Sequence, residues 1–480
     1  MLQRETMPHL YQSDEAGHQI QFILLITITI KTMKYIMKSC AALLLLFSSC
    51  DGFLDEKPSL SLVVPSKLAD FEALLNNDNQ VFNISPAIGE IGSADYFTTV
   101  ERWETYSTQL EREAYIWGDE VHANGNMPDW ATPFQQIFYA NVVLDGIAAL
   151  NISSEEQAQA ERLKGTALFF RANAYHNLMV LFCPFARFDD TSDKLGLPIR
   201  ASSNIQDPIT RASLQEVKDF IKKDLEEALD LVPETEPMKT LPSKLTVLSL
   251  LMRVHFMEAD YSKALDYGLL AMEYSPELID LTALPQSAAN PFGIFNKEVV
   301  FYSHLNPYNY FNSPLTFVDE NLLELYGDDD SRVGHFFIDR GTGGLNVKAF
   351  HTGRNLWFGG IGTNEIYLTV SECLARDGRL EEAAQILESL LENRIFDLEP
   401  VTFENSTEAL DFILKERRKE LLFRGIRWMD LRRLNEEGAG IILTRQLGEN
   451  TITLSPNSPR YVFPLPPSEV ERSGIEQNPR

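Results

Sequence analysis

Two stretches with the same helical pattern constrain the fold of this 480-residue chain more than any other feature. ADYSKALDYGLLAME follows a helical segment at 243–257, and DGRLEEAAQILESLLE follows another at 365–376. Each contains a short turn and then a helix led by alanine, so that each pair of helices forms a hairpin. Such a hairpin leaves an apolar face open and needs a neighbour to bury it. The sequence therefore predicts a mainly α-helical protein built on stacked hairpins.

The pattern is typical of tetratricopeptide-type hairpins, but the two matches are partial and unevenly spaced. Apolar residues at i, i+3 and i+4 extend the helical scaffold beyond them. They predict helices over 68–75, 130–147, 213–232 and 407–424, and one that follows Ser153 and ends near Phe182. Ser153-x-x-Glu156 and Ser213-x-x-Glu216 are capping boxes, so we expect each box to begin its helix.

The helical pattern is interrupted between Ser275 and Thr363 by a stretch rich in proline, glycine, asparagine and aromatic residues. One strand is expected in this stretch, over EVVFYS at 298–303. A long insert in a helical protein is usually functional. Residues 76–129 also lack long periodic runs and are expected to form irregular surface structure. The fold class is therefore a helical-hairpin scaffold with a large loop-rich insertion.

The stretch KYIMKSCAALLLLFSSCDGFLD at 34–55 has the features of a secretory signal. Two lysines precede an apolar run that is too short to cross a membrane. The run ends in Ser-Ser-Cys50, which resembles a bacterial lipobox whose cysteine is acylated and becomes the mature N-terminus. Several acyl chains on one cysteine anchor a protein stably. The alternative is plain secretion, with Cys50 a free thiol or core residue.

A signal normally begins near its own start codon, which favours Met33 or Met37 over Met1 as the true start. The expected organisation is a doubtful extension at 1–32, a lipoprotein signal peptide at 33–49 and a mature domain at 50–480. Within the mature domain, 50–274 is the N-terminal part. The C-terminal part is 275–480, which includes the insert at 275–363.

The net charge of −27 argues against nucleic acid or an anionic membrane surface as a partner, because both need basic patches. The sequence has no H-E-x-x-H, G-x-S-x-G, Walker or zinc pattern, so no catalytic residue, metal or cofactor is expected. Asp328 to Asp330 with Arg332 offers calcium-type ligands, but a solvated acidic turn is the preferred interpretation. Cys183 and Cys373 are expected to be buried free thiols rather than a disulfide.

Seven segments, in order along the mature chain, resemble the SusD/RagB family of nutrient-binding outer-membrane lipoproteins. They are CDGFLDEKP, YANVVLDGI, KGTALFFRANAYHNLMVLF, SLQEVKDFIKKDLEEALDLVP, EIYLTVSECLARDGRLEEAAQIL, ERRKELLFRGIRWMDLRRL, and YVFPLPPSEV with the following QNP. Two positions depart from the family pattern. Gly362 stands where the family often has arginine, and Arg424 stands where an acid is common.

The resemblance implies a SusD-like fold whose loop-rich half binds ligand without catalysing a reaction. It also implies a SusC-like TonB-dependent β-barrel transporter as partner, and a place in the outer membrane, facing outward and held by lipid on Cys50. Family members bind glycans or, in some cases, peptides. The expected function is capture of an oligosaccharide and its delivery to the transporter. A peptide-binding version, a non-catalytic tetratricopeptide-like adaptor and a surface hydrolase are the alternatives.

Aromatic side chains in loops are the best candidates for contact with a sugar, because a ring offers a flat apolar surface to its C–H faces. The candidates are Trp103, Tyr106, Tyr308, Tyr310 and Trp357, with core packing under a loop as the alternative for each. Candidate polar partners are Asn306, Asn309, Arg354 and Asn355. Trp117, Trp130 and Trp428 are expected in the core. Glu420 and Arg424 stand at i,i+4, and acids and arginines interleave through Asp430, so this basic run is expected to form a structural ion-pair network.

Overall fold

The computed structural model describes residues 65–122, 127–190, 192–288, 290–348 and 350–480. The chain divides into two units, Met1–Val64 and Pro65–Arg480, and the second unit is described here by itself. The predicted signal peptide, the lipidation site at Cys50 and the boundaries before residue 65 lie outside the described residues.

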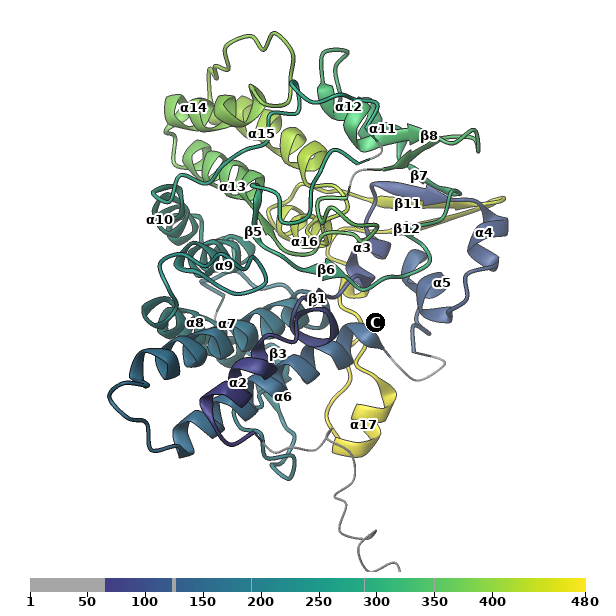
Figure 1. The fold of residues 1–480 in the computed structure, drawn as a ribbon. Coiled ribbons are helices and arrows are strands. Elements are labelled where there is room, and N and C mark those ends of the chain that lie inside the picture. The colour runs from purple at the N-terminus through teal and green to yellow at the C-terminus, as the bar shows by residue number, and fades with distance from the viewer. Residues whose placement is uncertain (1–64, 123–126, 191, 289, 349) are drawn as a thin grey trace, which may run out of the picture. The chain divides into compact units, whose positions relative to one another are not determined.

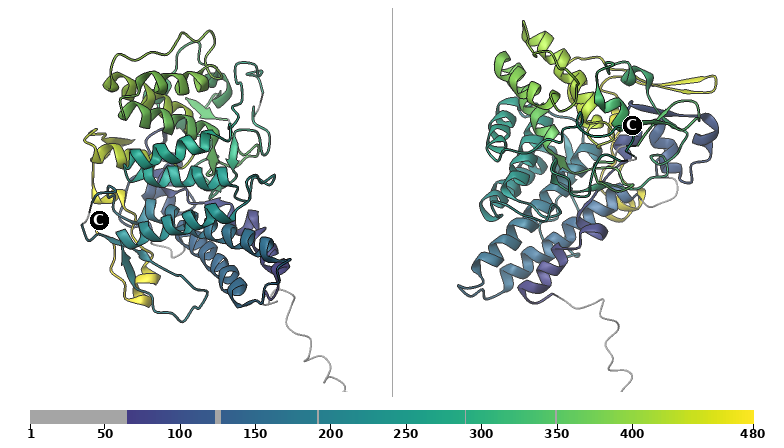
Figure 2. Two further views of the ribbon diagram at one scale, coloured as in Figure 1. Left: turned by 90° about the vertical axis from the view of Figure 1, so that its left-hand side faces the viewer. Right: turned by 45° about the horizontal axis from the view of Figure 1, so that its top comes forward.

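The predicted helical scaffold is confirmed. Its helices are α2 (Leu68–Leu75), α6 (Pro128–Ala149), α7 (Gln157–Phe182), α8 (Leu214–Leu231), α9 (Lys244–Met257), α10 (Tyr261–Met272), α13 (Thr363–Arg376), α14 (Leu380–Leu391), α15 (Ser406–Glu420) and α16 (Arg427–Glu436). Neighbouring helices pack in chain order from α6 through α10, and α10 then packs against α13 across the insert (Figure 1). Figure 2 shows the same succession of helices from two other sides.

The two hairpins recognised in the sequence, α9–α10 and α13–α14, lie next to each other through α10 and α13. Ala264 and Ala383, the alanines near the start of the second helix in each hairpin, are fully buried. Gly268 permits the close approach, because a Cβ atom at this position would lie 2.6 Å from Cγ2 of Val370 on α13. Small residues therefore set the distance between the hairpins, as the turn-then-alanine pattern predicts.

The predictions made for the two capping boxes have different outcomes. Ser213 caps α8 as predicted: its hydroxyl accepts the Glu216 N–H at 3.2 Å, and the Glu216 carboxylate accepts the Ser213 N–H at 2.8 Å. Ser153 also donates to the Glu156 carboxylate, but α7 begins only at Gln157. The prediction that this box begins the helix is therefore wrong, since the box closes a separate turn ahead of α7.

The helix predicted over 407–424 ends earlier, at Glu420. Phe423 and Gly425 have φ angles of 55° and 75°, in the left-handed region that a right-handed helix excludes. The chain therefore turns between α15 and α16, and the side chains of this turn project toward the insert rather than along a helix face.

Short elements build the loop-rich half. Before α6 they are η2 (Asp78–Phe82), β1 (Ile84–Ser85), α3 (Ile88–Gly92), β2 (Tyr96–Thr98), α4 (Val100–Glu104) and α5 (Gln109–Tyr115). In the insert they are β5 (Val299–Phe301), β6 (His304–Leu305), β7 (Thr316–Val318), α11 (Glu320–Leu323), α12 (Ser331–Phe336), β8 (Phe337–Asp339), β9 (Leu345–Val347) and β10 (Ile361–Gly362). The predicted strand at 298–303 is thus present as β5.

Strand pairing joins the insert to the N-terminal loops. β1 pairs in parallel with β6, and β2 pairs antiparallel with β7, with Tyr96 opposite Val318. β5 pairs with β10, and β8 with β9, inside the insert. Two stretches that are far apart in sequence therefore form one loop-rich region beside the helices (Figure 1).

Beyond α16 the chain forms a hairpin of β11 (Leu443–Leu447) and β12 (Asn450–Leu454), which the sequence patterns did not reveal. A smaller pair, β3 (Leu195–Pro198) and β4 (Arg211–Ser213), follows α7. The proline-rich end contains η3 (Pro459–Tyr461) and α17 (Pro467–Ser473). It packs back onto the scaffold, where Asn478 Nδ2 donates to the carbonyl of Phe182 at 2.8 Å.

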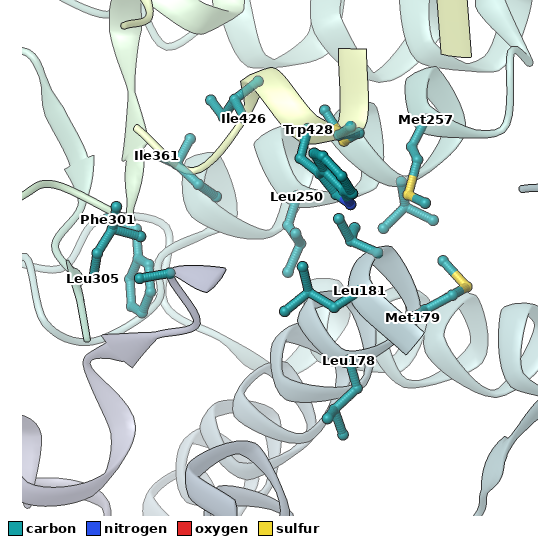
Figure 3. Packing of buried hydrophobic residues seen from close by; sticks show 14 of the residues in the cluster. Leu178, Met179, Leu181, Leu250, Met257, Phe301, Leu305, Ile361, Ile426 and Trp428 are labelled. Carbon is teal, nitrogen blue, oxygen red and sulfur yellow. The ribbon is translucent and has the colours of Figure 1, made fainter. Parts of the chain in front are cut away.

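The main core cluster extends from α2 to the C-terminal segment, and Figure 3 shows the part of it that includes residues of α7, α9 and α16. Trp428 is fully buried there, and Gly89 and Gly92 of α3 lie against its ring. Trp117 and Trp130 are buried as well, as predicted. Cys183 and Cys373 are buried free thiols, which confirms the favoured interpretation. Among the described residues, no helix combines the length and apolarity needed to span a membrane.

Candidate ligand pocket

A pocket of about 270 Å³ opens in the loop-rich half, and we call it the Trp357 pocket. All of its lining residues but one belong to the insert, and the exception, Phe423, lies in the turn after α15. The lining consists of Phe311, Asn312, Ser313, Pro314, Thr316, Arg340, Asn346, Val347, Phe350, Asn355, Trp357 and Phe423. The insert was the predicted location of a binding site, and the scaffold contributes a single aromatic ring.

The apolar part of the pocket is a cluster of aromatic rings around Trp357. Its indole stacks on Phe423, and the rings of Phe350 and Phe311 pack against it at centroid distances of 4.8 and 5.9 Å. Trp357 is only 4% exposed, and its buried Nε1–H has no acceptor among the described residues. The ring is therefore held rigidly, with one strong hydrogen-bond donor unused.

The polar part of the pocket contains amide and hydroxyl groups. Asn346 joins two segments of the pocket wall, since its Nδ2 donates to the backbone carbonyls of Pro314 and Thr316 at 3.0 and 2.8 Å. Asn312 and Asn355 are exposed at the pocket and leave their side chains available. Arg340, in the turn between β8 and β9, is the one charged residue of the described lining. This combination can pack against an apolar face and hydrogen-bond several hydroxyl groups.

Three of the five predicted aromatic residues lie in the core instead of the pocket. Tyr106, Tyr308 and Tyr310 are at most 9% exposed, and unlike the equally buried Trp357 none of them lines the pocket. The Tyr308 hydroxyl donates to the buried carboxylate of Asp129, and Tyr106 and Tyr310 pack ring against ring at 5.3 Å. Burial strongly raises the pKa of Tyr308 and of Tyr310. These side chains support the loops from inside, so the alternative of core packing applies to them.

Trp103 is partly buried on α4 and does not line the pocket. Its indole N–H donates to the carbonyl of Arg112 at 3.0 Å, which fixes α4 against α5. Of the predicted aromatic contacts, the structure thus places Trp357 alone at the pocket. Asn355 is the one candidate polar partner that joins it.

The other candidate polar residues lie elsewhere. Asn306 is buried and donates to Asp129, Asn309 donates to Ser107 Oγ at 2.8 Å, and the exposed Arg354 is outside the lining. The residues that sequence reasoning missed at the pocket include Phe423, Phe350, Asn346 and Arg340. No local pattern distinguishes them, because long-range packing brings them together.

Buried ion pairs hold the insert to the scaffold, as the predicted network requires. Arg394 donates to Glu298 in the insert at 2.6 Å and to Glu420 at the end of α15 at 2.9 Å. Arg332 binds the other oxygen of Glu420 at 3.1 Å. Burial alone would raise the pKa of Glu420, but these two guanidinium groups lower it to about 2.

Two predictions about charged residues need correction. Glu420 does not pair with Arg424, because α15 ends between them and the helical i,i+4 relation is lost. The acidic turn at Asp328 to Asp330 is not wholly solvated, since Asp330 is buried and binds Arg332 at 2.7 Å. Among the described residues, no group of histidine, cysteine or acidic side chains is arranged to hold a metal ion.

The fold is a helical-hairpin scaffold with a pocket in its loop-rich half, and comparison with known proteins gives its family. Residues 52–256 match the family model described as starch-binding associating with outer membrane, and residues 363–480 match that of the SusD family. The chain belongs to the SusD/RagB family, and its mainly helical fold is the SusD-like fold.

Solved structures have the same fold. A SusD superfamily protein from Bacteroides thetaiotaomicron is 21% identical, with a TM-score of 0.71 over 86% of this chain and 100% of that chain. A putative sugar binding protein from Bacteroides vulgatus gives the same identity and TM-score over 87% and 99%. A SusD-like carbohydrate binding protein from Bacteroides vulgatus is 22% identical, with a TM-score of 0.66 over 85% and 97%. No curated protein matches this chain.

Proposed function

We propose that this protein is a lipid-anchored surface protein that binds an oligosaccharide in the Trp357 pocket and delivers it to a SusC-like TonB-dependent transporter. The observation that carries the proposal is the lining of the pocket, where a fixed aromatic cluster meets asparagine, serine and threonine side chains. The description of the family as starch-binding supports a carbohydrate as the ligand class, and so does the similarity to a putative sugar binding protein and to a carbohydrate binding protein.

The chemistry of the lining suits a sugar. A pyranose ring has apolar C–H faces and hydroxyl groups around its edge, so it can pack against the half-buried Phe350, which is backed by Trp357, while Asn355 and Asn312 bind its hydroxyls. The pocket volume of about 270 Å³ is near the lower end of ligand sites, which span about 300–1,000 Å³. It therefore suits a short part of a glycan chain, with the remainder outside. Binding breaks no bond, so the protein acts as a non-catalytic carrier.

The anchor and the transporter rest on the signal at 34–55 and on family membership. Acylation of Cys50 would hold the binding half close to a membrane-embedded partner, so that captured ligand need not diffuse far. Fatty-acid labelling tests the anchor: label on the wild-type protein that is lost in Cys50→Ala supports it, and absence of label from both contradicts it. Co-purification of a TonB-dependent barrel with the lipidated protein tests the partner.

The ligand is tested with glycan and peptide panels offered side by side to purified protein that begins at Asp51. Asn355→Ala and Asn309→Ala form a matched pair, because both asparagines are exposed in the insert but only Asn355 lines the pocket. We expect an oligosaccharide to bind wild type and Asn309→Ala equally. Asn355→Ala should bind it several-fold more weakly, as for the loss of one hydrogen bond of about 1 kcal/mol.

The other outcomes identify the rival functions. Binding of peptides alone indicates the peptide-binding version of the same transport system. Binding of neither class indicates a helical-hairpin adaptor, and release of reducing ends from a polysaccharide indicates a hydrolase. Equal loss of affinity in both asparagine variants would contradict the Trp357 pocket as the site.

A further inference from the structure

Arg424, in the turn after α15, is a buried arginine without a counter-charge. It is 4% exposed, and no carboxylate lies within 4.0 Å of its guanidinium group among the described residues. Its one side-chain hydrogen bond with a described residue is long, from Nη1 to Asn364 Oδ1 at 3.3 Å. Nε and Nη2 are buried and have no acceptor in the described part of the chain. The guanidinium also lies over the Phe358 ring at 4.4 Å, which offsets only part of the cost of burial.

The other buried arginines of the described chain do not share this state. Most bind a carboxylate, as Arg253 binds Glu365 with contacts of 2.7 and 2.6 Å. Arg432 and Arg445 lack a carboxylate but donate to backbone carbonyls, as Arg432 does to Val180 and Cys183. Leaving a buried charge without such partners is strongly unfavourable, because the charge loses its hydration. The position of Arg424 therefore calls for an acceptor that the protein itself does not supply.

A small cavity of about 40 Å³ lies beside Arg424, and we call it the Arg424 cavity. Its lining includes His176 and Asn177 of α7, and buried His176 Nδ1 and Asn177 Nδ2 also lack a partner among the described residues. Leu181, Leu305 and Ile426, labelled in Figure 3, belong to its apolar wall. Four polar nitrogens without a partner thus belong to residues that line one cavity.

Nearby acidic groups do not balance the charge of Arg424. Glu365 is bound through both oxygens to Arg253, so that pair is neutral. Glu90 is the carboxyl group of the lining, and its Oε2 accepts the Gly425 N–H at 2.7 Å. Burial, and then the neighbouring Asp95, raise the pKa of Glu90 to about 8. Glu90 is therefore mostly protonated at pH 7, and the more distant Glu298 and Glu420 are bound to Arg394.

We propose that the Arg424 cavity binds one small monovalent inorganic anion, such as chloride, through Arg424 and Asn177, with His176 beside it. The size of the cavity supports this class of ligand, since about 40 Å³ holds one small ion or about three water molecules but no sugar. Charge-assisted hydrogen bonds from Arg424 would stabilise the ion. Because the lining comes from α3, α7, α9 and the turn before α16, the ion would be a structural one that ties these elements together.

Thermal unfolding of the purified protein tests the proposal. The melting temperature is measured in sodium chloride, sodium bromide and sodium gluconate at one fixed ionic strength. We expect both halides to raise it in a saturable way, by about 3 °C at a hundredfold excess over the dissociation constant. Gluconate is too large for the cavity and should have no such effect. Equal melting temperatures in all three salts would overturn the proposal.

Arg424→Met removes the charge, and we expect its melting temperature to be the same in halide and gluconate. Arg432→Met is the matched control. Arg432 is as buried as Arg424 and also lacks a carboxylate partner among the described residues, but it does not line the cavity. This variant should keep the full halide effect, even if it is less stable. A halide effect that persists in Arg424→Met, or that is lost from Arg432→Met as well, counts against the site.

Crystals of the wild-type protein grown in bromide provide a test that does not depend on a variant. An anomalous bromide peak beside the Arg424 guanidinium is the expected result. Density for water alone in the cavity, with no anomalous signal at high bromide concentration, would overturn the proposal.

Discussion

The indole of Trp357 stacks on the phenyl ring of Phe423, with 4.6 Å between the ring centroids and 23° between the planes. Trp357 belongs to the insert, whereas Phe423 lies in the turn that follows α15 of the scaffold. The φ angle of Phe423 is 55°, a conformation that costs a non-glycine residue energy and that this packing stabilises. One aromatic contact therefore joins the proposed binding half to the helical half.

Replacing Phe423 with alanine should weaken both stability and ligand binding. The variant removes the ring beneath Trp357, and loss of a buried phenylalanine costs about 3–5 kcal/mol. Urea unfolding measures the first effect and calorimetric titration with the identified glycan measures the second. Phe188→Ala is the control, because Phe188 is 46% exposed and its loss should change the unfolding free energy by less than about 0.5 kcal/mol. If folded Phe423→Ala binds the ligand with unchanged affinity, the Phe423 ring does not contribute to the binding site.

Replacing Arg394 with methionine should be strongly destabilising. The substitution leaves Glu298 and Glu420 with fewer partners in a buried position, at a cost of about 3–5 kcal/mol. Arg379→Met breaks an exposed pair with Glu382 and should leave the denaturant midpoint nearly unchanged. Similar midpoints for the two variants would show that the buried network contributes little.

Glu90 should make the protein less stable as the pH rises. Its pKa is about 8 in the folded chain and near 4.5 in the unfolded chain, so the folded state holds an extra proton between these values. The unfolding free energy then falls as pH rises from about 4.5 to 8, by on the order of 4 kcal/mol.

Glu90→Gln tests this dependence, because glutamine keeps an acceptor for the Gly425 N–H but cannot ionise. The variant should gain stability relative to wild type on going from pH 5 to pH 8.5. Parallel pH profiles of the two proteins, measured by urea unfolding, would contradict the expectation.

The two serine capping sequences provide a matched pair. Ser213→Ala removes the N-cap of α8 and should lower the unfolding free energy by about 1 kcal/mol. Ser153→Ala removes the same side chain from a turn that precedes α7, so its effect should be smaller. Thermal or urea unfolding compares them directly. A larger loss of unfolding free energy in Ser153→Ala would mean that the turn before α7 contributes more to stability than the N-cap of α8.

Sequence periodicity predicts the scaffold well because each hairpin forms from residues that are close together in the sequence. The bounds of α9, α10, α13 and α14 follow from apolar spacing and short turns, and the cap at Ser213 follows from two side chains three residues apart. The i,i+4 rule fails at Glu420 and Arg424 because it presumes a helix that the turn at Phe423 ends.

The pocket is harder to predict because its residues meet only through long-range packing. Tyr308, Tyr310 and Trp357 all lie in the insert, and nothing in their neighbours along the chain indicates that only Trp357 reaches the pocket. The sequence does not mark Phe423 as a pocket residue, because it lies in a stretch with the pattern of the helical scaffold. Pairings such as β2 with β7 decide which loop side chains lie inside, and they join residues more than two hundred positions apart.

The position of Phe423 late in the chain also implies that the Trp357 pocket forms after the helical hairpins during folding. The hairpin α9–α10 has only local contacts to make and can form while later residues are still leaving the ribosome, whereas the Trp357 pocket lacks a ring until the turn after α15 has docked. Distant contacts form more slowly than local ones. In a refolding experiment the helical circular dichroism signal should therefore recover before ligand binding does, which would make capture of the glycan a marker of a fully assembled chain.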